Sequence, residues 1–307
     1  MRTLGLSSLL VGALLAACGG TEDPLAIDEA IVVHQADFKR GELPGAAPGT
    51  AGLEPRVTSY TLGFGVLRPG SVNAQVSGRA SQAAYSVGLR FRDQGSGFWV
   101  RSVGAEDPLI PGELQWQLSL DAAVDIAPGL HELEVVAFDV DGKAGAKSSL
   151  PVCVASELPD NLNVCNPTAQ PPLVVASLSW NTDSDLDLSV VAPDGTTYGR
   201  SKRSLLQAGK ALVRLDGDGV SGCLADGRRL ENIVFNEPPA GTWRLYANIF
   251  DACGKTGANF TLTIFQRRAN PDGTFALDEV RSVDGRFVRA QANGGAASPL
   301  YLTEIQF

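Results

Sequence analysis

The sequence predicts an all-β protein made of two β-sandwich domains. Its 307 residues include 34 glycines and 18 prolines, and only 19% are charged, where about a quarter is usual. Short apolar runs separated by turn residues recur along the chain, and no helical period of useful length appears. The length suits two domains of ordinary size, and a hydrophobic share of 44% is enough to build their cores.

Residues 1–17 have the layout of a secretory signal peptide. A positive charge at Arg2 precedes an apolar run of about 12 residues, which is too short to span a bilayer. The ending Leu15-Ala16-Ala17-Cys18 resembles the bacterial lipobox, whose cysteine is acylated on its thiol. We therefore expect a membrane-anchored lipoprotein, with the outer membrane favoured because Gly19 rather than an acid follows Cys18. The alternative is an ordinary signal peptide with a chance cysteine.

Residues 18–55 are expected to form a flexible, lipidated tether. This segment is rich in Gly, Pro, Ala and acids, a composition typical of linkers, with a short ordered piece expected at Ala30 to Val33.

Residues 56–155 are expected to form the first sandwich, which we predict to be immunoglobulin-like. Turn signals such as Ala127-Pro128-Gly129 and Asp141-Gly142 separate about seven short runs, the spacing of this fold. The run between those two turns resembles the penultimate strand and following hairpin of many bacterial surface Ig-like domains. Within it His131 shares the parity of the apolar Leu133, so we expect a buried or edge-strand histidine.

Residues 156–172 are expected to be a linker, and the cysteines beside and beyond it are expected to form disulfides. An even number of cysteines besides Cys18 suits an oxidising compartment. Three connectivities are possible; proximity favours Cys153 with Cys165 and Cys223 with Cys253, each worth roughly 3 kcal/mol. Zinc is the alternative, although no C-x-x-C spacing or nearby histidine supports it.

Residues 173–307 are expected to form the second sandwich. Alternating apolar positions predict strands near 174–180 and 186–190, and later runs predict strands at 243–250, 260–265, 275–283 and 300–307.

Part of this second region resembles the bacterial YfaP-type family, also called DUF2135. The resemblance rests on Trp180 followed by Asp185-Leu186-Asp187-Leu188 and on Pro239-Ala240-Gly241-Thr242-Trp243, and it covers roughly residues 173–266. Ser189 stands where the family usually has a histidine. The resemblance implies a periplasmic or surface β-sandwich of undefined activity.

Clustered aspartates make calcium the one cofactor that the sequence indicates. Asp183, Asp185 and Asp187 recur at every second residue and would share one face of an extended strand. Asp216 and Asp218 form a second acidic turn, and oxygen-rich turns suit calcium. We predict a calcium site formed by Asp183, Asp185, Asp187 and Asp216; the alternative is a solvated face with aspartates capping turns.

No catalytic residues are predicted, and nucleic acid is an unsuitable partner. The net charge of −9 and pI near 4.8 oppose phosphate binding. The only histidines are His34 and His131, and no G-x-S-x-G elbow supports a Ser-His-Asp triad.

The sequence as a whole indicates a non-enzymatic lipoprotein of the bacterial envelope. We expect it to be anchored to the membrane by its lipid and to bind an envelope protein or glycan. The alternatives are an accessory subunit that holds substrate for a carbohydrate-active or peptidase system, and a structural envelope spacer.

Overall fold

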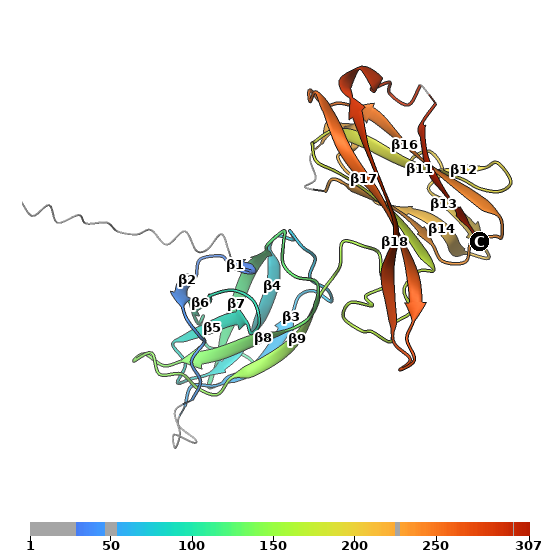
Figure 1. Cartoon of the computed structure of the whole chain (residues 1–307). Helices are drawn as coiled ribbons and strands as arrows, with labels where there is room; N and C mark the ends of the chain where they lie inside the picture. Colours follow the sequence, from blue (N-terminus) through green and yellow to red (C-terminus); the bar gives the residue numbers. More distant parts are fainter. Residues whose placement is uncertain (1–28, 47–53, 225–227, 297) are drawn as a thin grey trace, which may run out of the picture.

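A computed structural model describes residues 29–46, 54–224, 228–296 and 298–307. Within these ranges the chain is all-β, as predicted, with four antiparallel sheets and no α-helix. Strands β1–β9 form one β-sandwich and β10–β19 form another (Figure 1). Among the described residues, no helix has the length and apolar character needed to cross a bilayer.

The first sandwich has the strand order of an immunoglobulin-like fold. One sheet has the order β1-β7-β4-β3 and the other β2-β6-β5-β8-β9, so β3-β4-β7 take the places of strands A, B and E, and β5, β8 and β9 those of C, F and G. The strands are β1 Ile31–Val33, β2 Asp37–Arg40, β3 Val57–Leu62, β4 Ala74–Ser81, β5 Ser86–Phe91, β6 Gly97–Ser102, β7 Glu113–Ala122, β8 Gly129–Phe138 and β9 Ser148–Val154.

The short ordered piece predicted at Ala30 to Val33 is present as β1, but the prediction of a flexible tether is wrong for the residues that follow it, up to Ala46. β1 pairs with β7, and β2 pairs with β6, so this segment adds an edge strand to each sheet. Ile31 and Leu43 are 3% and 1% exposed, and the Trp99 indole donates to the Ile31 carbonyl at 2.9 Å. The polar composition of the segment concealed these few buried anchors. The rest of the predicted tether that precedes Glu29, together with the signal peptide and Cys18, lies outside the described residues.

The second sandwich packs a six-stranded sheet against a four-stranded one. Their orders are β13-β14-β15-β10-β17-β18 and β12-β11-β16-β19. The strands are β10 Val174–Trp180, β11 Asp185–Val191, β12 Thr197–Tyr198, β13 Ser204–Gln207, β14 Lys210–Asp216, β15 Leu230–Phe235, β16 Thr242–Asp251, β17 Gly257–Ala269, β18 Phe275–Val288 and β19 Leu300–Gln306.

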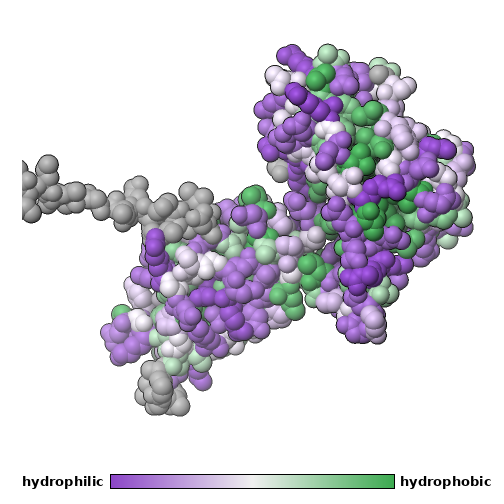
Figure 2. All heavy atoms as spheres, in the orientation of Figure 1, coloured by the Kyte–Doolittle hydropathy of each residue, from purple (hydrophilic) through white to green (hydrophobic). Residues whose placement is uncertain are grey.

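The core of the second sandwich follows the predicted alternation. Leu178, Leu186 and Leu188 are fully buried and lie in one apolar cluster with the fully buried Trp243. The segment predicted as a linker, 156–172, contains turns and no strand. On the face shown in Figure 2, apolar residues gather on the second sandwich, whereas the first is mostly hydrophilic.

Both predicted disulfides are present. Cys153 is bonded to Cys165 and Cys223 to Cys253, with Cα–Cα distances of 5.6 and 5.4 Å. The zinc alternative fails for these cysteines, because all four sulfurs are in S–S bonds.

Candidate metal centre

Three aspartates of the second sandwich converge at one edge of β11. Asp185 and Asp187 belong to β11, and Asp218 follows β14; one carboxylate oxygen from each lies within 4.8 Å of the others. Asp185 is fully buried, and the side chain of Asp218 is only 19% exposed. Carboxylates this close repel one another unless a proton or a cation lies among them.

The local pairing of β11 explains why they meet there. β16 pairs with β11 along its whole length, but β12 pairs only with Val190 and Val191, so the first half of the other edge has no neighbouring strand. A short 3₁₀ turn, η2 (Ser221–Cys223), lies against this edge. Its Gly222 N–H donates to Asp185 Oδ2 at 2.8 Å. The turn that carries Asp218 is thereby placed beside the β11 aspartates.

A fourth acid, Glu231, reaches the same place from the opposite sheet. It lies on β15 and is 1% exposed, and its Oε2 accepts the Leu188 N–H of β11 at 2.6 Å. The bond joins the two sheets where β11 lacks a strand neighbour. Glu231 is close enough for its charge to interact with those of the three aspartates.

The aspartates still have unused acceptor capacity. The Oδ1 atoms of Asp185, Asp187 and Asp218 are buried without a hydrogen-bond partner. The second oxygen of Asp218 is 3.6 Å from Arg203 Nη1. Asp185 and Asp187 form no ion pair with any described lysine or arginine. Buried acceptors without partners are costly, and a cation bound by all three Oδ1 atoms would remove that cost.

Burial makes these acids hard to ionise without a cation. It raises the pKa of Asp187 to about 6, with a further contribution from the charge of Asp185. Burial also raises the pKa of Asp185, and that of Glu231 well above its usual range. Arg200 opposes the shifts at Asp185 and Asp187 from a distance. Its guanidinium carbon is 4.2 Å from the centre of the Phe250 ring.

Two of the four ligands predicted from sequence lie outside this cluster. Asp183 precedes β11 in a turn, so the two-residue period of a strand does not apply to it. Arg229 donates to Asp183 Oδ1 from Nε at 2.9 Å and from Nη2 at 2.7 Å, and it holds the pKa of Asp183 below its ordinary value. Asp216 ends β14 and forms an ion pair with Arg214. The structure thus brings together Asp185 and Asp187 but not Asp183 or Asp216.

The acids that complete the cluster are Asp218 and Glu231. Gly217 has φ +89° and turns the chain after β14, so that Asp218 rather than Asp216 reaches β11. A sequence signal existed for Glu231, because it shares strand parity with the buried Ile233 and Phe235. An acid in the inward register of a core strand indicates a special role.

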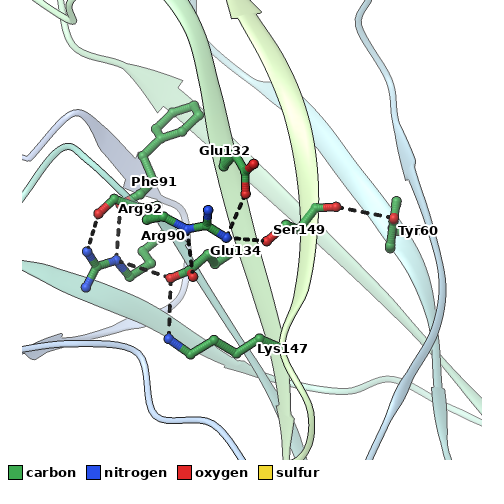
Figure 3. A network of polar contacts seen from close by, with 8 residues as sticks. All are labelled: Tyr60, Arg90, Phe91, Arg92, Glu132, Glu134, Lys147 and Ser149. Atoms are coloured by element: carbon green, nitrogen blue, oxygen red, sulfur yellow. Dashed lines mark hydrogen bonds and ion pairs between the residues drawn. The ribbon is translucent and has the colours of Figure 1, made fainter.

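Another buried glutamate, Glu134 of β8, has cations around it. Arg92 Nε is 3.2 Å from Oε1, while Lys147 Nζ and Arg90 Nε are 3.6 and 3.8 Å from Oε2 (Figure 3). Arg92 also pairs with Glu132 at 2.6 Å. These ion pairs satisfy the carboxylate without a ligand.

The histidine of β8 also has a structural role. His131 is 8% exposed, as the prediction of a buried or edge-strand residue required. Its Nδ1 is 2.9 Å from Asp93 Oδ2, and its Nε2 is 2.8 Å from the Ala127 carbonyl oxygen. Both ring nitrogens are therefore engaged within the first sandwich.

Comparison with known proteins finds no matching family model and no matching curated protein. The resemblance to the DUF2135 family therefore stays a prediction.

Proposed function

We propose that this chain is a non-enzymatic envelope protein whose second sandwich binds a divalent cation, calcium, and serves as an interaction module. One observation carries the calcium proposal: carboxylate oxygens of Asp185, Asp187 and Asp218 converge within 4.8 Å, and each of these residues has a buried Oδ1 without a hydrogen-bond partner. A bound cation would neutralise acids whose burial otherwise disfavours their charged forms.

The donor set favours calcium over other metals. All the converging donors are carboxylate oxygens, which suit hard cations, and the nearby Cys223 and Cys253 are in a disulfide. Calcium accepts six to eight oxygens in a flexible arrangement, whereas magnesium demands near-ideal octahedral geometry. We therefore expect magnesium to have a much smaller effect.

Thermal unfolding with and without calcium tests this proposal. Extracellular modules bind calcium with a Kd of about 10⁻⁴ to 10⁻³ M, so roughly 10 mM calcium adds about 1.4 to 2.7 kcal/mol to folding. In the mature chain carrying Cys18→Ser, the second sandwich should melt several degrees higher in calcium than in chelator.

Matched variants assign the effect to the cluster. Asp185→Asn combined with Asp187→Asn should abolish the difference between calcium and chelator. Asp183→Asn combined with Asp216→Asn removes the same charge but should preserve the difference, because these two acids are bound to arginines. Equal melting of the unaltered chain in calcium and chelator would refute the cation site.

We also propose that the chain is a lipoprotein, acylated at Cys18 and anchored to the membrane, with the outer membrane favoured. The lipobox-like motif before Cys18 supports this proposal. A Cys18→Ser variant with an intact signal should not incorporate radioactive palmitate. Labelling that persists in this variant would refute the anchor.

A role in binding an envelope protein or glycan is supported by a groove on the second sandwich that is lined by both apolar and polar side chains. Its volume is about 300 Å³. Grooves that combine apolar walls with a few polar groups often mark binding sites. The apolar residues that line it are Leu173, Val174, Ile264, Val280, Ile305 and Phe307.

Binding of the purified chain to envelope fractions distinguishes this role from its alternatives. Retention on cell-wall glycan would favour an accessory subunit that holds substrate for a carbohydrate-active system. Binding to no envelope fraction would favour a structural spacer.

A further inference from the structure

A single covalent bond fastens the turn that completes the cation site. Cys223, the last residue of η2, is bonded to Cys253. Its neighbour Gly222 donates the hydrogen bond to Asp185, and Asp218 lies five residues before Cys223. The contact between Gly222 and Asp185 thus belongs to a turn that the bridge holds in place.

The other end of the bridge is anchored beside the β11 aspartates. Cys253 follows β16, whose last residue, Asp251, pairs with Asp185 in the sheet. The Ser184 hydroxyl donates to the Ala252 carbonyl at 3.2 Å, and Cys253 N–H donates to Asp251 Oδ1 at 2.7 Å. The bridge therefore ties the η2 turn to the sheet that presents Asp185 and Asp187.

Residues at both ends of the bridge have backbone conformations that are unfavourable for residues other than glycine. Val220, Cys223 and Cys253 have φ of 57°, 63° and 49°, the left-handed region that residues with a Cβ seldom adopt. Val220 is 1% exposed in the core and would keep its anchor if the bridge were cut. Loss of the bridge would thus release Cys223 and the adjacent Gly222 while the sandwich stays folded.

We propose that the Cys223–Cys253 disulfide is a redox-controlled lock on the cation site, so that its reduction lowers calcium affinity. This inference rests on the proposed calcium function. The oxidised bridge holds the Gly222 N–H on Asp185 Oδ2. Reduction frees Gly222, and Asp185 then loses the hydrogen bond that fixes its carboxylate among the three aspartates.

The redox step is a thiol–disulfide exchange with a dithiol. One thiolate of the dithiol attacks a sulfur of the bridge; its second thiol then displaces the mixed disulfide and closes a cyclic disulfide. Two electrons and two protons pass to Cys223 and Cys253, which become thiols. Cys223 is exposed and Cys253 is partly exposed, so a small dithiol has access to the bridge.

Removal of each disulfide in turn tests the lock. Calcium binding is measured by equilibrium dialysis on the mature chain carrying Cys18→Ser. Cys223→Ser with Cys253→Ser should raise the Kd for calcium at least tenfold. The matched control, Cys153→Ser with Cys165→Ser, also removes one bridge but should leave the Kd unchanged.

A reciprocal measurement needs no cysteine variant. Coupling between two equilibria acts equally in both directions, so calcium should make the Cys223–Cys253 bridge harder to reduce. With a tenfold change in Kd, about 10 mM calcium should lower the equilibrium constant for reduction by dithiothreitol five- to tenfold, about 20 to 30 mV for a two-electron couple. Peptide mapping should show no such shift for Cys153–Cys165.

The outcomes separate this inference from the calcium function. No calcium binding by the oxidised chain refutes both. Calcium binding with equal Kd in the oxidised chain and in the Cys223→Ser, Cys253→Ser variant refutes the lock alone. If that variant fails to fold, the reciprocal measurement decides, and a reduction equilibrium insensitive to calcium overturns the proposal.

Discussion

Glu134 of the first sandwich and Glu231 of the second are both buried, and their carboxylates have different surroundings. Glu134 in the first has a side chain only 7% exposed and lies within 4.0 Å of nitrogens from Arg90, Arg92 and Lys147. Glu231 in the second is 1% exposed; it accepts one backbone N–H, and its charge interacts with those of three aspartates. Lysine and arginine side chains of the same chain neutralise Glu134. Glu231, in contrast, lies among other acids.

This contrast distinguishes structural charge clusters from binding sites. A carboxylate surrounded by cations of its own chain has no need for a ligand, whatever its burial. Carboxylates that converge with buried, unpartnered oxygens gain stability from an external cation. Burial of an acid alone therefore does not predict a metal site; burial together with a lack of countercharge from the chain does.

The largest effect should come from removing the charge at the compensated site. Glu134→Gln loses charge-assisted contacts to three cations, so the first sandwich should lose about 2 kcal/mol of unfolding free energy. Urea unfolding checks this value. Glu132→Gln, at a glutamate that is 48% exposed, serves as the control and should change stability little. A Glu134→Gln variant as stable as the unaltered chain would show that the ion pairs of Glu134 do not stabilise the first sandwich.

The same substitution at the uncompensated site should have the opposite sign. In chelator, Glu231→Gln relieves like-charge repulsion, and the amide oxygen can still accept the Leu188 N–H. The second sandwich should keep its stability or gain up to about 1 kcal/mol. Unfolding in chelator measures it. A loss of unfolding free energy as large as that of Glu134→Gln would show that Glu231 is not destabilised by the negative charges around it.

The pH dependence of the second sandwich should follow Asp187. Burial raises its folded pKa to about 6 from an ordinary 3.8, so between these values the folded state binds a proton that the unfolded state lacks. In chelator, stability should therefore rise as pH falls from about 6 to about 4. Asp187→Asn should show a smaller rise. A stability that falls through this window in the unaltered chain would contradict the raised pKa.

The first sandwich should respond to acid in a lower window. The hydrogen bond from Arg79 holds the pKa of Asp107 at about 2, below its ordinary 3.8. The stability that this depression contributes is present above the ordinary value and is lost as pH falls toward about 2. Asp107→Asn should flatten that acid limb, as thermal melts between pH 2 and 5 would show. An unchanged acid limb in Asp107→Asn would show that Asp107 does not cause the loss of stability at low pH.

The smallest effect should come from Asp183. Its partners Arg229 and Lys255 are 48% and 45% exposed, and exposed ion pairs contribute little. Asp183→Asn should leave the melting temperature in chelator within error and preserve the gain from calcium. Loss of that gain in Asp183→Asn would show that Asp183 is a calcium ligand.

The sequence predicted the sandwich cores because burial imposes a two-residue period. Leu186, Leu188 and Val190 alternate in the sequence and are all fully buried. The ordered segment from Glu29 to Ala46 was mostly missed. Its strands are three and four residues long, too short for a periodic signal, and cross-sheet contacts such as Trp99 with Ile31 hold it.

Half of the candidate site was predicted, for a related reason. Asp185 and Asp187 lie on one strand, so local spacing was enough to place them together. Asp218 depends on the turn at Gly217, and Glu231 approaches from the opposite sheet. Such long-range convergence is not encoded in spacing, and Asp183 lies outside the strand whose period was applied to it.

Calcium stoichiometry tests the central claim most directly. Equilibrium dialysis at pH 7 and millimolar free calcium should find one calcium per unaltered chain. It should find none per chain carrying Asp185→Asn and Asp187→Asn, and one per chain carrying Asp183→Asn and Asp216→Asn. No bound calcium in the unaltered chain, or equal binding by all three proteins, would contradict a cation site at Asp185, Asp187 and Asp218.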